Sequence, residues 1–214
     1  MGTSGKIPEN RLEKQDPRMK LLYASASPYS AKVRMAAAYA GIAIEPVAVK
    51  TDDNPASLID ANPLGKIPTL ILDGGDTVYD SRAITQYLNR LSRNALFPRN
   101  LEKRTSAEVL ESLADGLCDC LLSMVYERRR SEEKVDQIWL DKQWVKVVRV
   151  LDMLNANPPK LTSKITVGQI ALRAALGYLA LRFPGKWEKG RSRLVRWAAR
   201  FDEKFPELKA FVPS

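Results

Sequence analysis

Residues 62–83 restrict the fold of this chain more than any other stretch, because they combine turn, strand and helix-start signals. The apolar run at 69–72 predicts a short buried strand, and Pro68 before it suits the first residue of a strand or a special turn. The tight turn at 73–76, Asp-Gly-Gly-Asp, predicts a hairpin that returns as a strand at 77–79. The stretch therefore predicts a β-hairpin at a fixed place in the chain.

Strand and helix patterns alternate through the first ninety residues. Asp80 and Ser81 supply hydroxyl and carboxylate acceptors where a helix at 82–91 begins. The patterns before the hairpin predict a strand at 20–23, a helix at 31–40, a strand at 42–49 and a helix at 55–61. The order βαβαββα, with two crossovers and one hairpin, predicts a four-stranded mixed sheet covered by helices on both faces. This is the thioredoxin-like α/β arrangement.

No strand pattern appears after residue 98, which indicates an all-α second half. Helices are predicted at 110–130, 135–154, 166–183 and 191–204. Thr166 and Gln169 fit a capping box, and the nearly all-apolar helix that follows is expected at the centre of a helical bundle. We therefore expect a disordered tail at 1–18, a thioredoxin-like domain at 19–93 and an all-helical domain at 99–214.

Histidine is absent from the chain, which excludes a Ser-His-Asp triad, a Cys-His pair and the usual zinc-binding sets. Cys118 and Cys120 are two apart in a predicted helix, so they point to different faces and neither bridge each other nor chelate one metal. We expect no metal site. Any chemistry must use hydroxyls, carboxylates, amines, backbone amides or a borrowed group.

The net charge of +9 lies mostly in the second half, where residues 92–214 hold 23 basic and 15 acidic residues. These basic residues are spread along helices beside acids, which favours a solvated basic surface over a nucleic-acid site. No apolar run approaches the roughly 18 residues of a membrane span. Residues 1–18 lack the apolar core of a signal peptide, so we expect a cytoplasmic protein without nucleic-acid or membrane partners.

Two motifs in the first half give the chain a family resemblance. Ser-Pro-Tyr-Ser at 27–30 lies between strand and helix, where a glutaredoxin-like site carries Cys-Pro-Tyr-Cys. Ile67-Pro68 stands where the thioredoxin fold places a cis-proline that faces this site. Joined to an all-helical second half, these motifs resemble the cytosolic glutathione S-transferase family over nearly the whole chain from Met19.

Within this family, the chain most resembles a subgroup of bacterial transferases that share three sequence motifs. These are a Ser-Pro-Phe/Tyr site, the sequence Asn-Pro-Leu-Gly-Lys-Val/Ile-Pro, present here at 62–68, and Ala-Asp-Gly in the first bundle helix, present at 114–116. One residue departs from the family pattern, because the capping box usually ends in Asp and Gln169 stands here. Gln is an adequate partner in a capping box.

The resemblance implies a reaction in which glutathione is the co-substrate. A glutaredoxin attacks with its own thiolate, but the alkoxide of Ser27 is too basic for that role, so the nucleophile must be borrowed from glutathione. Ser27 would donate its hydroxyl hydrogen to the glutathione sulfur. The resulting thiolate would be conjugated to a small hydrophobic electrophile in an apolar cleft between the domains, lined partly by the helix at 110–126.

The resemblance also implies which residues bind glutathione. Ile67, before Pro68, would pair its backbone N–H and C=O with the cysteinyl unit, as an added strand does. Asp80 and Ser81 would hold the γ-glutamyl amine and carboxylate at a helix N-terminus, which suits anions. The residues implied near the glycyl end are Lys66 and Asn54.

Other interpretations stay open at this point. Ser27 taken alone is an ordinary N-cap, and Asp80-Ser81 taken alone is a pair of caps. A glutathione-dependent isomerase and a non-catalytic binding protein with the same fold are both consistent with the residues. The resemblance further implies a homodimer, whereas the electrophile and the purpose, detoxification or metabolism, are not readable from the sequence.

Overall fold

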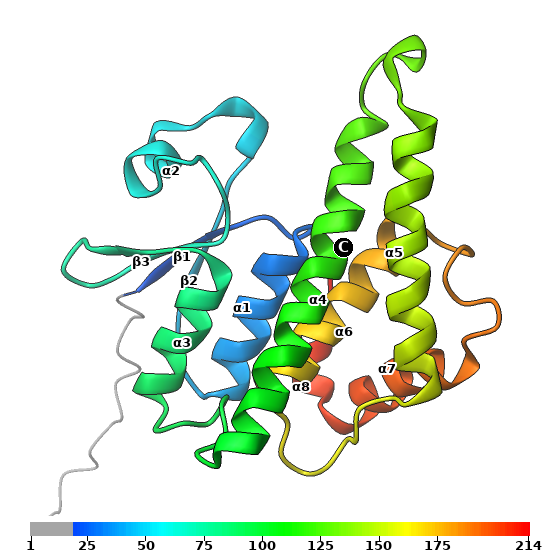
Figure 1. Cartoon of the computed structure of the whole chain (residues 1–214). Coiled ribbons are helices and arrows are strands. Elements are labelled where there is room, and N and C mark those ends of the chain that lie inside the picture. Colours follow the sequence, from blue (N-terminus) through cyan, green and yellow to red (C-terminus); the bar gives the residue numbers. More distant parts are fainter. Residues whose placement is uncertain (1–18) are drawn as a thin grey trace, which may run out of the picture.

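The computed structural model describes residues 19–214, so the predicted disordered tail at 1–18 lies outside the described residues. A mixed sheet with its helices forms the first part, and helices alone form the second (Figure 1). The elements of the first part are β1 (Lys20–Tyr23), α1 (Pro28–Tyr39), β2 (Glu45–Ala48), the 3-10 helix η1 (Thr51–Asp53), α2 (Ala56–Ala61), β3 (Thr69–Ile71), β4 (Thr77–Val78) and α3 (Ser81–Leu91). The predicted order βαβαββα is confirmed.

The four strands lie in the order β2-β1-β3-β4, with β1 and β2 parallel and the other pairs antiparallel. Successive strand residues face opposite sides of a sheet. Leu21 accordingly belongs to the main core with α1 and α3, while Leu22 packs with Leu58 of α2 on the other face. Helices thus cover both faces, which confirms the thioredoxin-like arrangement.

The second part is helical throughout, as predicted from the loss of strand patterns. Its elements are α4 (Leu101–Glu127), the 3-10 helix η2 (Glu132–Lys134), α5 (Gln137–Ala156), α6 (Val167–Arg182), α7 (Ser192–Lys204) and α8 (Pro206–Lys209). The predicted start of the first helix at 110 is wrong, because its first turns are largely exposed and carry no apolar stripe. Asn100 caps the true start, accepting the N–H of Lys103 at 3.0 Å.

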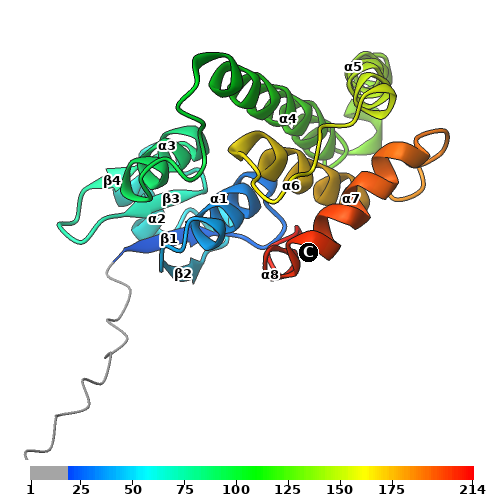
Figure 2. The same ribbon diagram turned by 90° about the horizontal axis from the view of Figure 1, so that it is seen from below.

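α6 lies at the centre of the molecule, packed against α1 and α4 (Figure 2). Thr166 and Gln169 form the predicted capping box at its start. Gly168 sits so close to α4 that a Cβ there would lie 2.7 Å from the carbonyl oxygen of Ala107. Only glycine permits this approach, and the close packing of α4 on α6 joins the helical part to the sheet part through α1.

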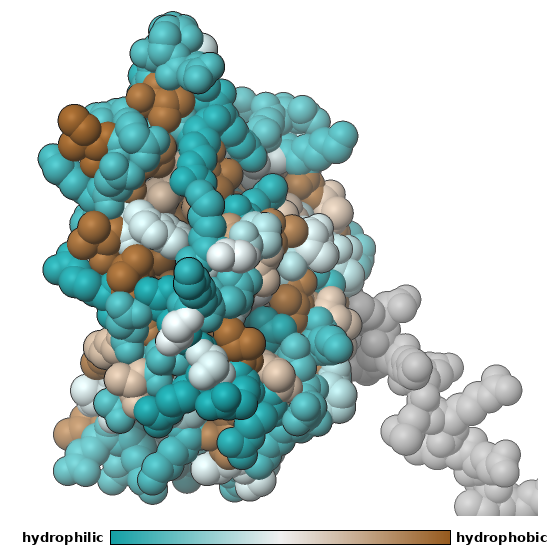
Figure 3. All heavy atoms as spheres, turned by 90° about the vertical axis from the view of Figure 1, so that its right-hand side faces the viewer, coloured by the Kyte–Doolittle hydropathy of each residue, from teal (hydrophilic) through white to brown (hydrophobic). Residues whose placement is uncertain are grey.

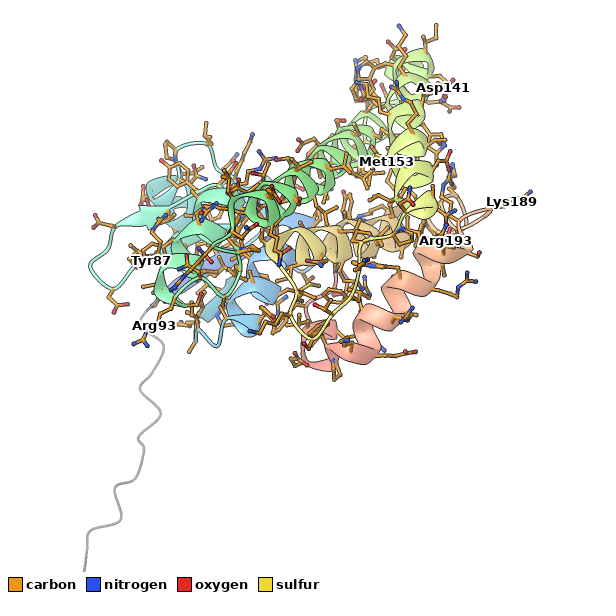
Figure 4. All side chains as sticks on the ribbon, turned by 60° about the horizontal axis from the view of Figure 1, so that its bottom comes forward. Tyr87, Arg93, Asp141, Met153, Lys189 and Arg193 are labelled. Atoms are coloured by element: carbon orange, nitrogen blue, oxygen red, sulfur yellow. The ribbon has the colours of Figure 1, made fainter. Side chains whose placement is uncertain are left out.

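The outer side of the helical part is mostly hydrophilic, with separated hydrophobic patches (Figure 3). Asp141 and Lys189 project outward there, away from the sheet (Figure 4). Acidic and basic side chains are therefore both exposed on this side of the molecule. Within residues 19–214, every helix is too short or too polar to cross a membrane. The cytoplasmic location stays a prediction.

Candidate functional site

Strand pairing brings three segments of the candidate site to one end of the sheet. β1 and β3 are antiparallel, with Leu22 opposite Thr69, so the chain that leaves β1 passes the chain that enters β3. β3 and β4 are also antiparallel, so the exit from β4 lies at that same end. The candidate residues at this end are Ser27, Ile67, Pro68, Asp80 and Ser81.

Ser27 is the N-cap residue of α1, directly before Pro28 at the first helical position. Its Oγ accepts the N–H of Ser30 at 3.2 Å, while its hydroxyl hydrogen has no acceptor among residues 19–214. Ser27 is half-buried, so a ligand can reach it, whereas the Ser30 hydroxyl is fully buried. The Ser27 side chain therefore caps the helix as an acceptor and keeps a donor at the positive end of the helix dipole.

The hydroxyls on either side of Ser27 already have partners. Tyr29 donates its phenolic hydrogen to Oδ1 of Asp119 in α4, and burial, helped by Cys118 and Asp119, raises the pKa of Tyr29 well above its ordinary value. Ser25 donates its hydroxyl to the carbonyl of Ser214 at 3.1 Å. The Ser30 hydroxyl has no partner within residues 19–214 but is fully buried, so Ser27 is the hydroxyl of this loop whose hydrogen is both unpaired and accessible to a ligand.

Ile67-Pro68 is a cis peptide, as the resemblance implies. The side chain of Asn62 fixes the loop before it by donating to the carbonyl of Lys66 at 2.9 Å and to Oγ1 of Thr69 at 3.2 Å. In contrast, the N–H and C=O of Ile67 pair with no backbone or side-chain group of residues 19–214. Because backbone polar groups are nearly always paired, Ile67 offers a donor and an acceptor to an extended ligand.

Asp80 and Ser81 form the start of α3, one residue earlier than the predicted 82–91. Asp80 is the N-cap, and its Oδ1 accepts the N–H of Arg82 at 2.9 Å. Ser81 is the first helical residue, and its hydroxyl pairs with no group of the described chain. This helix start combines a carboxylate, a hydroxyl and free amides, which suits a ligand that carries both an amine and a carboxylate.

Asn54 and Lys66 lie at the margin of this end of the sheet. Asn54 ends η1 in the left-handed region (φ 44°), and its Oδ1 lies 4.0 Å from where a Cβ of Gly65 would be. Lys66 is exposed. Within residues 19–214 neither side chain hydrogen-bonds to Ser27, and Asn54 lies beside Gly65, which directly precedes Lys66.

A buried ion cluster joins the elements that carry the site. Lys32 of α1 donates to Glu111 Oε1 at 3.1 Å and to Asp115 Oδ2 at 2.8 Å, and Lys32 is only 1% exposed. Asp115 also accepts Arg82 Nε at 2.8 Å, and Glu111 accepts the hydroxyl of Thr85 at 3.1 Å. α1, α3 and α4 are thereby held together by charge. Burial raises the pKa of Glu111 even though Lys32 opposes it.

Sequence reasoning did not find this cluster. Asp115 was visible as part of the Ala-Asp-Gly motif at 114–116, but nothing in its own neighbourhood identified a cationic partner. The available signal was Lys32, a cation flanked by Ala31 and Val33 in a largely apolar helix whose other cation is Arg34. A lysine in such a position either reaches solvent or is buried with a carboxylate partner. Only the packing of α4 on α1 decides between these two cases.

Two small cavities lie along α4 and α5, away from the candidate residues. One of about 210 Å³ is lined by Leu113, Gly116, Cys120, Lys146 and Val150, among others, and one of about 130 Å³ lies near Arg128 and Trp144. Neither is lined by a residue predicted to bind glutathione, so the predicted apolar cleft for the electrophile stays a prediction.

Cys118 and Cys120 are free thiols, as their spacing predicts. Burial raises the pKa of both thiols, Cys118 most strongly. Both are therefore protonated at neutral pH, and a protonated thiol is a weak nucleophile.

Comparison with known proteins now identifies the family. A family model described as "Glutathione S-transferase, N-terminal domain" matches residues 21–95. An uncharacterised GST-like protein of Escherichia coli K12, YibF, is 30% identical over 184 residues, which cover 83% of this chain and 91% of YibF. The chain therefore belongs to the glutathione S-transferase family.

Solved structures agree over nearly the full length. A glutathione S-transferase from Methylobacillus flagellatus KT with glutathione bound superposes with a TM-score of 0.85 at 35% identity, over 92% of this chain and 100% of that one. A glutathione S-transferase from Methylobacterium radiotolerans JCM 2831 in complex with glutathione sulfonate gives 0.84 at 31% identity, over 91% and 94% of the two chains. The fold of the whole described chain is thus that of the family.

Proposed function

We propose that this chain is a glutathione transferase in which Ser27 stabilises the thiolate of bound glutathione for attack on a small hydrophobic electrophile. The observation that carries the proposal is the free hydroxyl hydrogen of Ser27 at the start of α1, between Ser25 and Tyr29, whose hydroxyls are engaged. Relatives crystallised with glutathione and with glutathione sulfonate support glutathione as the ligand. The chain would belong to the bacterial subgroup with a Ser-Pro-Tyr/Phe site.

Glutathione would lie along the end of the sheet described above. The unpaired N–H and C=O of Ile67, directly before Pro68, would bond the cysteinyl unit. Asp80 would attract the γ-glutamyl amine, while Ser81 and the first amides of α3 would bond its carboxylate. The side chains proposed to reach the glycyl end are Lys66 and Asn54.

Thiolate stabilisation is a matter of a few kilocalories. A free thiol with a pKa of about 8.5 is only a few per cent ionised at neutral pH. A hydrogen bond from the Ser27 hydroxyl and the dipole at the N-terminus of α1 both favour the charged form. If together they contribute about 2–3 kcal/mol, the pKa falls by roughly two units, and most of the bound glutathione becomes reactive.

The proposed step is a substitution or addition at carbon. The thiolate electron pair forms a new S–C bond to the electrophile, and the leaving group departs with its electrons; in an addition, the adjacent carbon takes a proton from solvent. Tyr29 stays protonated and bonded to Asp119 and has no part in the step. The electrophile would bind between the two parts of the molecule, with α4 as one wall.

We also propose that the chain consists of two domains, at 19–93 and 99–214. Two copies of the chain would associate as a homodimer. Exposed apolar side chains on the helical part support a protein contact there: Val109 of α4 is 61% exposed, and Val145 and Met153 of α5 are more than half exposed. Light scattering at micromolar concentration is expected to give about twice the 24.0 kDa of one chain. A monomer under those conditions would contradict the dimer and leave the site proposal intact.

The experiment that tests the function combines binding with turnover. Glutathione titrated into the full chain should bind saturably, and a panel of aryl halides, epoxides and unsaturated carbonyls should include substrates that consume it. Retention on immobilised glutathione with no turnover of any electrophile would contradict the enzyme and favour a binding protein. Turnover without net loss of glutathione would favour an isomerase.

A further inference from the structure

Residues 211–214, named here the C-terminal strap, return to the loop that carries Ser27. The N–H of Ser214 donates to the carbonyl of Ser25 at 3.3 Å, and the hydroxyl of Ser25 donates to the carbonyl of Ser214 at 3.1 Å. Ser25 lies inside the turn that the N–H of Ser27 closes by bonding the carbonyl of Ala24 at 3.1 Å. The chain end marked in Figure 1 accordingly lies beside the start of α1.

The strap is seated on α6 at a position that only glycine allows. A Cβ on Gly177 would lie 2.6 Å from Cγ1 of Val212 and 2.7 Å from Cδ of Pro213, both far inside van der Waals contact. Pro213 is buried in this seat. The path of the strap is therefore fixed by the helical part of the molecule, at a point remote in sequence from the candidate site.

A cation–π contact anchors the other end of the strap. The guanidinium carbon of Arg34 in α1 lies 4.8 Å from the ring centroid of Phe211 and 4.5 Å from that of Tyr23, the last residue of β1. Arg34 is thus shared between the strap and the strand that leads into the turn at 24–27. The turn is consequently hydrogen-bonded to the strap through Ser25. Tyr23, directly before the turn, packs on the same arginine as Phe211 of the strap.

We propose that the C-terminal strap is a positioning device for Ser27: by holding Ser25, it fixes the turn at 24–27 and thereby the direction of the Ser27 hydroxyl. This inference rests on the proposed function of Ser27. Within residues 19–214 the strap makes no hydrogen bond to Ile67, Asp80 or Ser81, so we expect it to act on thiolate stabilisation and turnover and not on glutathione binding.

The first test displaces the strap without touching any hydroxyl. Gly177→Ala pushes Val212 and Pro213 off α6, and the expected result is a roughly five- to tenfold lower kcat at neutral pH, a raised pKa of bound glutathione and an unchanged KM for glutathione. Gly74→Ala is the control, because this glycine lies in the turn between β3 and β4 at the opposite end of the sheet and a Cβ there meets nothing within 4 Å.

A compensating variant separates the strap from any damage to α6. Gly177→Ala combined with Val212→Ala and Pro213→Ala removes the two clashing atoms, so it should recover most of the lost kcat and return the pKa of bound glutathione toward the wild-type value. If Gly177→Ala fails to fold, Phe211→Ala serves instead, because it removes the ring that contacts Arg34 and packs on the edge of the core, and it leaves α6 unchanged. It should lower kcat by roughly two- to fivefold.

Amide hydrogen exchange and the Ser27→Ala variant distinguish a failure of the strap proposal from a failure of the proposed function. Faster amide exchange at 24–27 together with a lower kcat in Gly177→Ala or Phe211→Ala supports the strap. Faster exchange with unchanged kcat and thiolate titration, or no change in exchange at all, overturns it. If Ser27→Ala itself keeps the wild-type titration, the proposed function fails, and the exchange data still show whether the strap holds the turn.

Discussion

Helix starts at the end of the sheet differ from the helix start at the centre of the bundle, although each of them carries a hydroxyl side chain. At α6 the cap is self-contained: Gln169 Oε1 accepts the N–H of Thr166 at 2.7 Å and its hydroxyl at 2.6 Å. At α1 and α3, the hydroxyl hydrogens of Ser27 and Ser81 have no acceptor within residues 19–214. The hydroxyl hydrogen is thus bonded within the protein at α6, whereas at the candidate site the hydroxyl hydrogens are available to a ligand.

This difference shows that a capping hydroxyl can bind a ligand only if its hydrogen is not already bonded within the protein. A hydroxyl that both donates and accepts within the protein stabilises the helix and has nothing left for a ligand. A hydroxyl that only accepts, as Ser27 does from Ser30, still stabilises the helix and keeps one donor available. Substitution at the two kinds of cap should therefore separate function from stability.

Ser81→Ala should give the largest effect in this comparison. If Ser81 bonds the γ-glutamyl carboxylate, removing that hydrogen bond costs about 1.5–3 kcal/mol, so the KM for glutathione should rise roughly ten- to a hundredfold. Steady-state kinetics with varied glutathione measure this. Ser112→Ala, at an exposed serine of α4, is the matched control. A variant with normal glutathione affinity would leave Ser81 as a structural residue only.

Thr166→Ala should give a smaller effect of a different kind, because it should lower stability and leave activity unchanged. Losing the capping box at α6 should lower the free energy of unfolding by about 1 kcal/mol. Chemical denaturation measures it, and Thr105→Ala, at an exposed threonine of α4, is the control. The pKa of bound glutathione should not change. An unchanged denaturation midpoint would show that the box does not stabilise α6.

Tyr29→Phe should give the smallest effect. The phenol is already bonded to Asp119, and burial keeps the pKa of Tyr29 high, so the hydroxyl neither donates to glutathione nor titrates near neutral pH. We expect kcat at neutral pH to change by less than about twofold. A tenfold loss with a higher pKa of bound glutathione would move the thiolate-stabilising role from Ser27 to Tyr29.

Much of the fold and some local features of the candidate site were predictable because their signals are local. The turn at 73–76, the Asp80-Ser81 helix start and the Thr166 capping box are each encoded within a few residues. The missed start of α4 also has a local cause, since exposed turns carry no apolar period.

The contacts around the site were not predictable, because their partners are far apart in the chain. Lys32 and Glu111 are separated by 79 residues, Tyr29 and Asp119 by 90, and Ser25 and Ser214 by 189. Each residue looks ordinary in its own neighbourhood. Which hydroxyl near Ser27 keeps a free and accessible hydrogen depends on these distant partners and on the burial of Ser30, so only the folded structure distinguishes Ser27 from its neighbours.

The measurement that tests the central claim most directly is thiolate absorbance against pH, recorded for wild type and Ser27→Ala with glutathione bound. Ser27→Ala should still fold, because an N-cap contributes only about 1 kcal/mol. It should still bind glutathione, because Ile67, Asp80 and Ser81 are unchanged.

In wild type, the pKa of bound glutathione should lie roughly two units below its free value, and in Ser27→Ala it should return toward that value. The rate at neutral pH should fall roughly ten- to a hundredfold and recover partly as the pH is raised, since more glutathione ionises by itself. Superimposable titrations for the two proteins would show that Ser27 does not stabilise the thiolate and would contradict the account.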